Sequence, residues 1–270
     1  MDQLSQSITG IGMEKKSNEI NNSTILITGA GKRLGLFITQ HYLAAGWRVI
    51  AHYNTSNEMS QREQDEWSNM GRYQALQADL TSVTQVSALV ADINQLQWPI
   101  DVVIHNASYF VADDPQASLL ERWQLQQDMM AVHVLSVEAL TRGLMARYCA
   151  NASIIAITDI YVEKPNQRFA SYCAAKAALQ NLCLSYSQRL APAVRVNIIQ
   201  PGPIQFLPEH SAAYRTKVLS QSLLKCELGY GSILQAIEYL QCAKGVTGSI
   251  LKVDGGRANV NHYEQLFSDK

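Results

Sequence analysis

The chain has 270 residues, which suits one α/β domain, or at most two small ones, with a sizeable core. Apolar residues make up 47% and charged residues 17%, a balance typical of globular rather than disordered chains. The net charge of −1 and the lack of a long basic run argue against a nucleic-acid-binding surface, and no apolar run approaches the ~18 residues of a membrane span.

The two ends of the chain are predicted to lie outside the folded domain. Residues 1–23 are polar and rich in Ser and Asn, without the apolar stretch of a signal peptide, so we predict a flexible leader. Translation could begin at Met1 or at Met13, and the sequence leaves both open. Residues 24–260 are predicted to form a single domain, followed by a C-terminal tail at 261–270.

The five cysteines form no CxxC pair, and none lies near a histidine at the spacing of metal ligands. We predict that they are reduced core thiols of a cytoplasmic protein and that the protein has no metal site.

Short β-branched runs alternate with longer helical patterns along the domain. Most runs are apolar on both faces, as is typical of strands in a parallel sheet covered on both sides. The predicted fold class is α/β: a single Rossmann-type, doubly wound, parallel seven-stranded sheet with helices on both faces and ligands at the carboxyl ends of the strands. The seven strands are predicted at 24–28, 48–53, 73–80, 101–108, 152–158, 194–201 and 248–256.

Helices are predicted between these strands from apolar residues at helical spacing. The clearest pattern runs from Val83 to Leu96, and longer candidates cover 118–150 and 170–190. The irregular stretch 202–230 follows the sixth strand, and we predict that it forms a loop over the substrate.

The stretch TGAGKRLG, residues 28–35, ends the first strand and opens a helix. Gly29 and Gly31 permit a tight turn and close approach of the backbone to a pyrophosphate, and Gly35 lets the helix pack close to the sheet. An ordinary glycine-rich turn is the alternative, but the strand–turn–helix context favours a dinucleotide site.

The end of the second strand indicates which dinucleotide binds. An NAD site usually has an acid there for the ribose 2′-hydroxyl, but this strand ends in Tyr53 and continues with Asn54 and Thr55. Lys32 and Arg33 instead supply positive charge that suits a 2′-phosphate, so the predicted cofactor is NADPH.

Two further strand ends contribute to the predicted cofactor site. Asp79 ends the third strand and could bond the adenine amine or serve only as a turn acid. Asn106 and Ala107 end the fourth strand and are predicted to pass close to the cofactor ribose.

Tyr172 and Lys176 stand at i and i+4 in the helix predicted at 170–190, and therefore on one face of it. A phenol with a pKa near ~10 is a poor acid–base group at neutral pH, and a neighbouring ammonium is expected to lower that pKa. Such pairs also occur by chance on surface helices. The glycine turn, the NAS strand end at 106–108 and the QPG stretch at 200–202 argue for a catalytic pair.

This order of motifs closely resembles the short-chain dehydrogenase/reductase family over residues 24–257. The resemblance implies an NAD(P)-dependent Rossmann domain, often a homotetramer, with Tyr172 and Lys176 as a catalytic pair that also contacts the cofactor. The same site is expected to include Leu34, Leu80, Ser108, Pro201, Gly202 and Ile204.

Three features resemble the pteridine reductase branch of this family, and within it the bacterial dihydromonapterin reductases. Arg33 stands where most members have glycine, and Phe110 matches the aromatic ring that stacks the pterin against the nicotinamide. Asp159, thirteen residues before Tyr172, stands in the usual serine position. The resemblance implies that Asp159 joins the catalytic pair and that the substrate is bound by Arg33, Ser108, Phe110, Asp159 and Tyr172.

The carboxylate of Asp159 favours one kind of substrate. A carbonyl that becomes an alkoxide needs a hydrogen-bond donor, whereas an ionised carboxylate only accepts and repels the growing negative charge. A ring imine instead gains a proton on nitrogen, and its heterocycle carries N–H groups that a carboxylate can accept from. Asp159 can also bond the Tyr172 hydroxyl and sustain a proton relay. The alternative is a turn acid at a strand end.

Two positions depart from the pattern of related families. His133 stands where most of the wider family has the asparagine of a proton relay, and it could equally be a packed helix histidine. Asn54 and Thr55 stand where pteridine reductases often place an arginine for the 2′-phosphate. No acid appears there either, so NADPH stays the predicted cofactor.

The predicted function is NADPH-dependent reduction of a dihydropterin, such as 7,8-dihydromonapterin, dihydrobiopterin or dihydrofolate, to its tetrahydro form. The alternatives are a short-chain carbonyl reductase, such as a 3-oxoacyl reductase, and a nucleotide-binding sensor without turnover. Asp159 and Arg33 argue against the carbonyl reductase, and the Tyr172–Lys176 pair argues against the sensor. The sequence does not rank the pterins, because their side chains would meet the 202–230 loop.

Overall fold

The structure, a computed structural model, describes residues 22–260. The predicted C-terminal tail, residues 1–21 of the predicted leader and both candidate start methionines lie outside the described residues. Seven strands form one sheet in the order β3-β2-β1-β4-β5-β6-β7, and all paired neighbours run parallel. Their bounds are β1 Thr24–Thr28, β2 Arg48–Tyr53, β3 Tyr73–Gln77, β4 Ile100–His105, β5 Tyr148–Ile157, β6 Val194–Pro201 and β7 Ile250–Val253.

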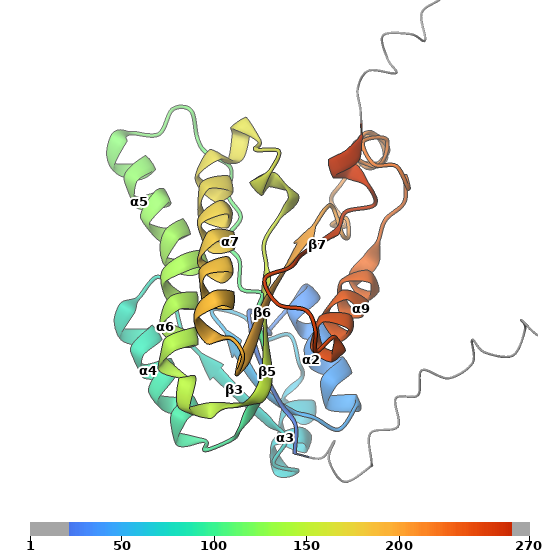
Figure 1. Ribbon diagram of the computed structural model, residues 1–270. Helices are drawn as coiled ribbons and strands as arrows, with labels where there is room; N and C mark the ends of the chain where they lie inside the picture. The colour runs from blue at the N-terminus through green and yellow to red at the C-terminus, as the bar shows by residue number, and fades with distance from the viewer. Residues whose placement is uncertain (1–21, 261–270) are drawn as a thin grey trace, which may run out of the picture.

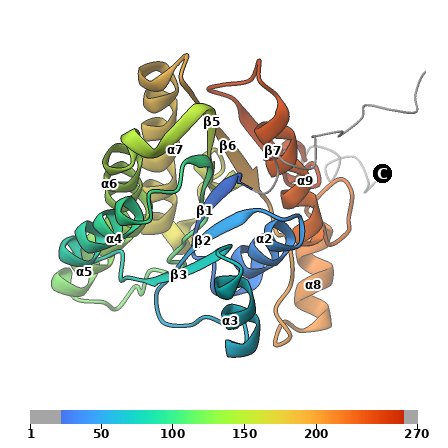
Figure 2. The ribbon, with the colours of Figure 1, turned by 90° about the horizontal axis from the view of Figure 1, so that it is seen from below.

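Helices cover both faces of this sheet (Figures 1 and 2). One face carries α4 (Val83–Gln95), α5 (Leu119–Met130), α6 (Ser136–Gly143) and α7 (Ala170–Leu190). The other face carries α2 (Arg33–Ala44), α3 (Gln61–Asn69) and α9 (Gly229–Cys242), while α8 (Ala212–Leu219) lies within the 202–230 segment. The predicted doubly wound α/β fold is confirmed.

The core is divided by the sheet into two apolar clusters. Ile25 and Ile27 of β1 pack in the cluster under α2 and α9, whereas Leu26 packs in the cluster under α4 and α7. Successive side chains of a strand point to opposite faces. All three residues have no solvent exposure, which explains why the strand sequences are apolar throughout.

The predicted helix at 118–150 is divided in the structure. After α5 the chain forms a π-helix, η1 (Ala131–Leu135), then α6 and a 3₁₀ turn, η2 (Met145–Arg147). β5 already begins at Tyr148, which pairs with Ile100 of β4. The helical assignment of 148–150 was therefore wrong, because strand pairing with a distant segment prevails there over local pattern.

Four predicted strands end earlier than expected. Residues 78–80, 106–108, 158 and 254–256 follow β3, β4, β5 and β7 outside the sheet. These segments follow the carboxyl ends of parallel strands, which is where a doubly wound fold binds its ligands.

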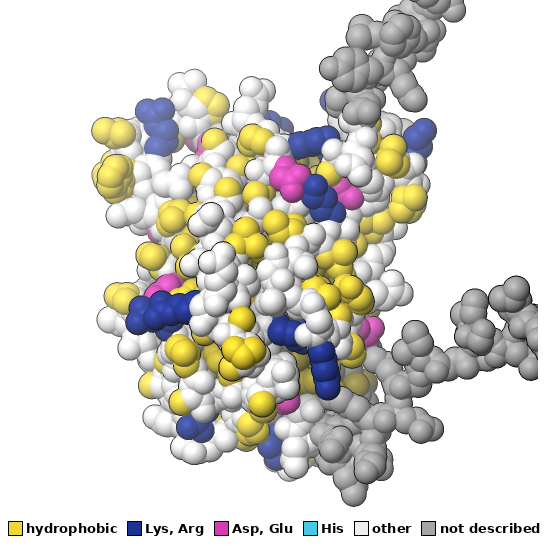
Figure 3. All heavy atoms as spheres, viewed as in Figure 1, with side chains coloured by type: hydrophobic (Ala, Val, Ile, Leu, Met, Phe, Trp, Pro, Cys, Tyr) yellow, Lys and Arg dark blue, Asp and Glu magenta, His cyan; other side chains and the backbone are white. Residues whose placement is uncertain are grey.

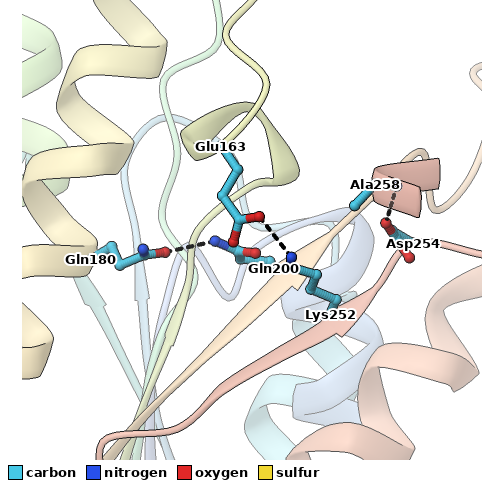
Figure 4. A network of polar contacts seen from close by, with 6 residues as sticks. All are labelled: Glu163, Gln180, Gln200, Lys252, Asp254 and Ala258. Atoms are coloured by element: carbon cyan, nitrogen blue, oxygen red, sulfur yellow. Dashed lines mark hydrogen bonds and ion pairs between the residues drawn. The ribbon is translucent and has the colours of Figure 1, made fainter. Parts of the chain in front are cut away.

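Side-chain contacts tie the carboxyl ends of β5, β6 and β7 together (Figure 4). Nε2 of Gln200 in β6 donates to the side-chain Oε1 of Gln180 in α7 at 2.7 Å. Lys252 of β7 pairs at 2.6 Å with Glu163, which follows the 3₁₀ turn η3 (Ile160–Val162) after β5. Further along the chain lie two more 3₁₀ turns, η4 (Gln167–Phe169) and η5 (Arg257–Asn259).

The surface carries charged side chains dispersed among apolar and uncharged ones on the face of Figure 3. Within residues 22–260, none of the helices combines the length and apolar character needed to cross a bilayer. Cys173 and Cys183 are buried as predicted, but Cys226 and Cys242 are exposed, so the prediction that all five cysteines are core thiols was wrong.

Candidate active site

A cavity of about 730 Å³ opens at the carboxyl ends of the strands. It brings together every residue that the sequence predicted for cofactor binding, substrate binding or catalysis, although their roles in binding and catalysis stay predictions. The predicted residues that line it are Gly29, Gly31, Lys32, Arg33, Leu34, Tyr53, Asn54, Thr55, Asp79, Leu80, Asn106, Ala107, Ser108, Phe110, Asp159, Tyr172, Lys176, Pro201, Gly202 and Ile204.

The glycine turn after β1 is held against the end of β4. Gly29 has φ +66°, and a Cβ there would lie 2.8 Å from the Cα of Ala107, so no larger residue fits without a shift. Asn106 donates from Nδ2 to the carbonyl oxygens of Thr28 and Gly29, at 3.0 and 3.1 Å. Asn106 therefore braces the turn, which is a role additional to the predicted approach to the ribose.

The amino end of α2 faces this cavity without a side-chain cap. Lys32 is its N-cap residue and makes no capping hydrogen bond, so the first N–H groups of the helix stay available for an anion. Lys32 and Arg33 are exposed, and neither forms an ion pair within residues 22–260. Arg33 has φ +53°, a left-handed conformation that favours glycine. These groups together form a positively charged end of the cavity.

His52 also lines the cavity, although the sequence did not predict it as a site residue. The Gly29 N–H donates to Nδ1 of His52 at 3.3 Å, so the ring proton lies on Nε2, which donates to the Ala78 carbonyl at 3.0 Å. Burial lowers the pKa of His52, which keeps the ring in this neutral tautomer. His52 therefore links the glycine turn to the loop after β3. No sequence signal marks it, because both partners are backbone groups of other strands.

Asp79 has a clear structural role in its own turn. Its Oδ1 accepts from the N–H and the hydroxyl of Thr81, at 2.9 and 2.8 Å. These contacts support the turn-acid alternative, while the cavity-lining position of Asp79 leaves the adenine contact as a prediction.

Asp159 joins the turn after β5 to helix α7. Its Oδ1 accepts from the Tyr161 N–H at 2.8 Å and caps the 3₁₀ turn η3, while its Oδ2 accepts from the Tyr172 hydroxyl at 3.1 Å. Both interpretations from the sequence, a turn acid and a partner of the tyrosine, are therefore seen in one side chain.

Lys176 lies one helical turn beyond Tyr172 and is almost fully buried. Its ammonium lies 5.6 Å from the centre of the Tyr172 ring and donates to the Ile157 carbonyl at 2.8 Å. Burial lowers the pKa of Lys176 to about 8, although the negative charge of Asp159 opposes that shift.

The expected lowering of the Tyr172 pKa by Lys176 was wrong. Burial raises this pKa well above its usual value, and the charge and hydrogen bond of Asp159 raise it further. Burial also raises the pKa of Asp159, against the lowering effects of its hydrogen bonds and of the charges of Lys176 and Arg257. Tyr172 is therefore a neutral phenol that donates to Asp159.

Phe110 also lines the cavity, and 51% of its surface is exposed. One face of its ring stacks on Phe169, with centroids 4.4 Å apart and planes 14° apart. Its centroid lies 4.8 Å from that of Tyr172, in an edge-on arrangement. A ring supported on one face and exposed elsewhere suits the stacking of a flat ligand.

His133 lies in the π-helix η1 behind this aromatic group. The Tyr109 N–H donates to its Nε2 at 3.2 Å, so Nδ1 carries the proton and donates to the Met129 carbonyl at 3.0 Å. The Ser108 hydroxyl also lies within hydrogen-bond distance of Nε2, at 3.2 Å. Because burial holds the pKa of His133 far below its usual value, the ring is a neutral brace for residues 108–109.

Other cavity residues come from segments whose position depends on tertiary structure. Asp128 and Val132 approach from the α5–η1 region, and Tyr230 approaches from α9. Gln205 comes from the predicted substrate loop, which does reach the cavity. No group of three or more His, Cys, Asp or Glu in the described chain is arranged to hold a metal ion.

Curated relatives share most of this chain. A dihydromonapterin reductase of Shigella flexneri is 35% identical over 237 residues, which cover 86% of this chain and 95% of the relative. The dihydromonapterin reductase of Escherichia coli strain K12 matches with the same identity and coverage.

Solved structures and a family-level comparison agree with that similarity. The alternative dihydrofolate reductase 1 of Brucella canis, complexed with NADP, is 26% identical with a TM-score of 0.79, over 90% of this chain and 96% of that one. The same protein from Brucella suis, also with NADP, is 26% identical with a TM-score of 0.77, over 89% of this chain and 97% of that one. The short chain dehydrogenase family matches residues 23–216. The chain belongs to the short-chain dehydrogenase family.

Proposed function

We propose that this protein uses NADPH to reduce a dihydropterin, such as dihydromonapterin, to its tetrahydro form. The observation that carries the proposal is the 3.1 Å hydrogen bond between Asp159 and Tyr172, both of which line the cavity. The carboxylate stands where a carbonyl reductase needs a donor. Relatives 35% identical to the chain are dihydromonapterin reductases, and similar solved structures hold NADP.

The residues around the glycine turn fit a phosphorylated dinucleotide. The uncapped amino end of α2 would hold the pyrophosphate, and Lys32 and Arg33 would meet the 2′-phosphate. No acidic side chain from the end of β2 lines the cavity, since Tyr53, Asn54 and Thr55 occupy that place. NADPH supplies the hydride when it is bound.

The substrate end fits a flat, nitrogen-rich ring. Phe110 would stack on one face of the ring, and Asp159 would accept from its N–H groups. Tyr172, a neutral phenol hydrogen-bonded to Asp159, would pass its proton to the ring nitrogen of the substrate, and the phenolate left behind would take a proton back from water before the next turnover. Asp159 would then orient Tyr172, and Lys176 would hold the nicotinamide ribose.

Initial rates of NADPH oxidation test this proposal. We expect turnover with dihydromonapterin or dihydrofolate, a higher kcat/KM for NADPH than for NADH, and slower turnover of ketones such as 3-oxoacyl substrates. Equal kcat/KM values for the two cofactors would remove the basis for NADPH. Faster ketone reduction would favour the carbonyl reductase alternative, and binding without turnover would favour the sensor.

We also propose that residues 24–260 act as one domain in a cytoplasmic homotetramer. The free cysteines fit a reducing compartment. Exposed apolar side chains at the start of α5 (Leu119, Leu120 and Trp123) fit burial between subunits. Light scattering after size-exclusion chromatography measures the subunit number directly.

A further inference from the structure

The segment 253–257, VDGGR, lies against the second half of the predicted substrate loop. The Leu224 N–H donates to the Gly255 carbonyl at 3.0 Å. Gly256 has φ +78°, and a Cβ there would lie 2.8 Å from a methyl carbon of Leu223. Gly256 therefore lets this segment pack closely against the loop.

Arg257 extends that packing with two charged hydrogen bonds. Its Nη1 donates to the Val218 carbonyl at 2.8 Å, near the end of α8, and its Nη2 donates to Oε1 of Gln221 at 2.5 Å. Asp254 fixes the turn that carries Arg257, because its carboxylate accepts from the N–H group of Gly256 at 2.9 Å and from that of Ala258 at 2.7 Å. Figure 4 shows the contact with Ala258. A planar guanidinium presents its N–H groups in a fixed fork that matches two such partners, whereas a lysine ammonium is a point charge on a flexible stem.

Arg257 also lies close to the active site. A small hollow is lined by Arg257, Asp254 and Pro203, and Pro203 also lines the large cavity. The positive charge of Arg257 acts on Asp159 and lowers its pKa, against the larger effect of burial. The other titratable groups that act on or respond to Asp159 are Tyr172, Cys173 and Lys176, all of α7.

We propose that Arg257 is a positioning residue of the active site, which anchors the 202–230 segment beside the cavity. The proposal rests on the proposed pterin reduction for the identity of the substrate. Anchoring α8 in this way fixes the loop that contributes Gln205 to the cavity.

Two variants test the anchor. Arg257→Lys keeps the charge and loses the two-pronged contact, whereas Arg257→Gln loses both. Lys252→Gln is the matched control, because it removes a cation from neighbouring β7 whose partner is Glu163. In the full chain without ligands, hydrogen exchange of the α8 amides at 212–219 should become about tenfold faster in both Arg257 variants and stay unchanged in the control.

Kinetics supply the second readout. Both Arg257 variants should raise KM for the dihydropterin about tenfold while the Kd for NADPH stays unchanged. The kcat at saturating dihydropterin should stay within about twofold of the wild type in both variants, because Arg257 acts on the loop and not on the reacting atoms.

Unchanged exchange in α8, or an unchanged KM for the dihydropterin in Arg257→Gln, overturns the proposal. An equal acceleration of α8 exchange in Lys252→Gln also overturns it, because the loss of any nearby cation would then have the same effect. If the wild-type protein does not reduce dihydropterins, the proposed function fails, whereas the exchange experiment still decides whether Arg257 anchors the loop.

Discussion

Asp159 uses its two carboxylate oxygens for two separate tasks, since one caps the turn after β5 and the other accepts from Tyr172. Asp159→Ala should lower kcat for a dihydropterin about 10²- to 10⁴-fold, because the tyrosine loses its orienting partner. The Kd for NADPH should change little, since the glycine turn is held by other residues. Steady-state kinetics and fluorescence titration with NADPH measure the two quantities.

Asp159→Ser is the informative companion of that variant. A serine can still cap the turn, but its hydroxyl donates a hydrogen bond, as carbonyl reduction requires. The variant should therefore lose pterin turnover and gain weak carbonyl reduction. Full pterin turnover in Asp159→Ala would show that the carboxylate only supports the turn.

Arg33 is held in a left-handed conformation at φ +53°, although its side chain has no ion-pair partner among the described residues. This conformation costs a non-glycine residue roughly 1–2 kcal/mol. Arg33→Gly should therefore raise the free energy of unfolding by roughly 1 kcal/mol and also raise KM for NADPH. Urea denaturation and initial-rate kinetics report the two effects.

Gln97→Gly is the control for Arg33, because Gln97 has a similar φ of +56° and does not line the cavity. It should gain stability with unchanged kinetics. If Arg33→Gly leaves KM for NADPH unaltered, the arginine is not a cofactor ligand.

At the scale of the element, helix α7 buries Tyr172 and Lys176 one helical turn apart, and Lys176 donates to the carboxyl end of β5. Tyr172→Phe removes only the hydroxyl, so it should abolish most turnover while the thermal midpoint stays close to that of the wild type. Lys176→Met should weaken both NADPH binding and turnover, because its ammonium is buried beside Asp159. Unchanged turnover in Tyr172→Phe would mean that water delivers the proton.

The elements also show what the sequence can predict. β1, β2, β6 and α7 have the predicted bounds, because each apolar pattern ends at a clear turn or helix signal. The 118–150 prediction was wrong at its end because Tyr148 pairs with a strand far away in the sequence. Local pattern carries no information about such pairing.

The same limit applies to the site. The motif residues were predicted because their types and spacing carry chemistry. His52, Asp128 and Tyr230 were not predicted, because only the folded chain brings them to the cavity. The pKa of Tyr172 is likewise raised by burial and by Asp159, and the spacing of residues in the sequence does not indicate how deeply a side chain is buried.

At the scale of the whole molecule, His52, His105 and His133 are buried histidines with lowered pKa values. Burial lowers the pKa of His105 to about 4. The folded protein keeps this ring neutral at pH 5, whereas the unfolded chain takes up a proton as the pH falls through about 6.5. His105 therefore leaves the free energy of unfolding unchanged above about pH 6.5 and lowers it at more acidic pH, by about 2 kcal/mol at pH 5.

The urea midpoint of unfolding should therefore fall as the pH is lowered from 7.5 to 5. This fall should be smaller in His105→Gln than in the wild type. A pH dependence that is the same in both proteins would contradict this assignment for His105.

The cavity of about 730 Å³ has a further consequence for the order of events. The same space extends from the glycine turn to Phe110 and Asp159, so the two ligands would occupy adjoining parts of one chamber. One face of the Phe110 ring is covered by Phe169, and its exposed part would form one wall of the pterin place. Under the proposed function the bound dinucleotide would supply another wall, so we expect the pterin to bind only after the dinucleotide has entered. Catalysis should follow a compulsory sequence in which NADPH binds first and NADP⁺ leaves last.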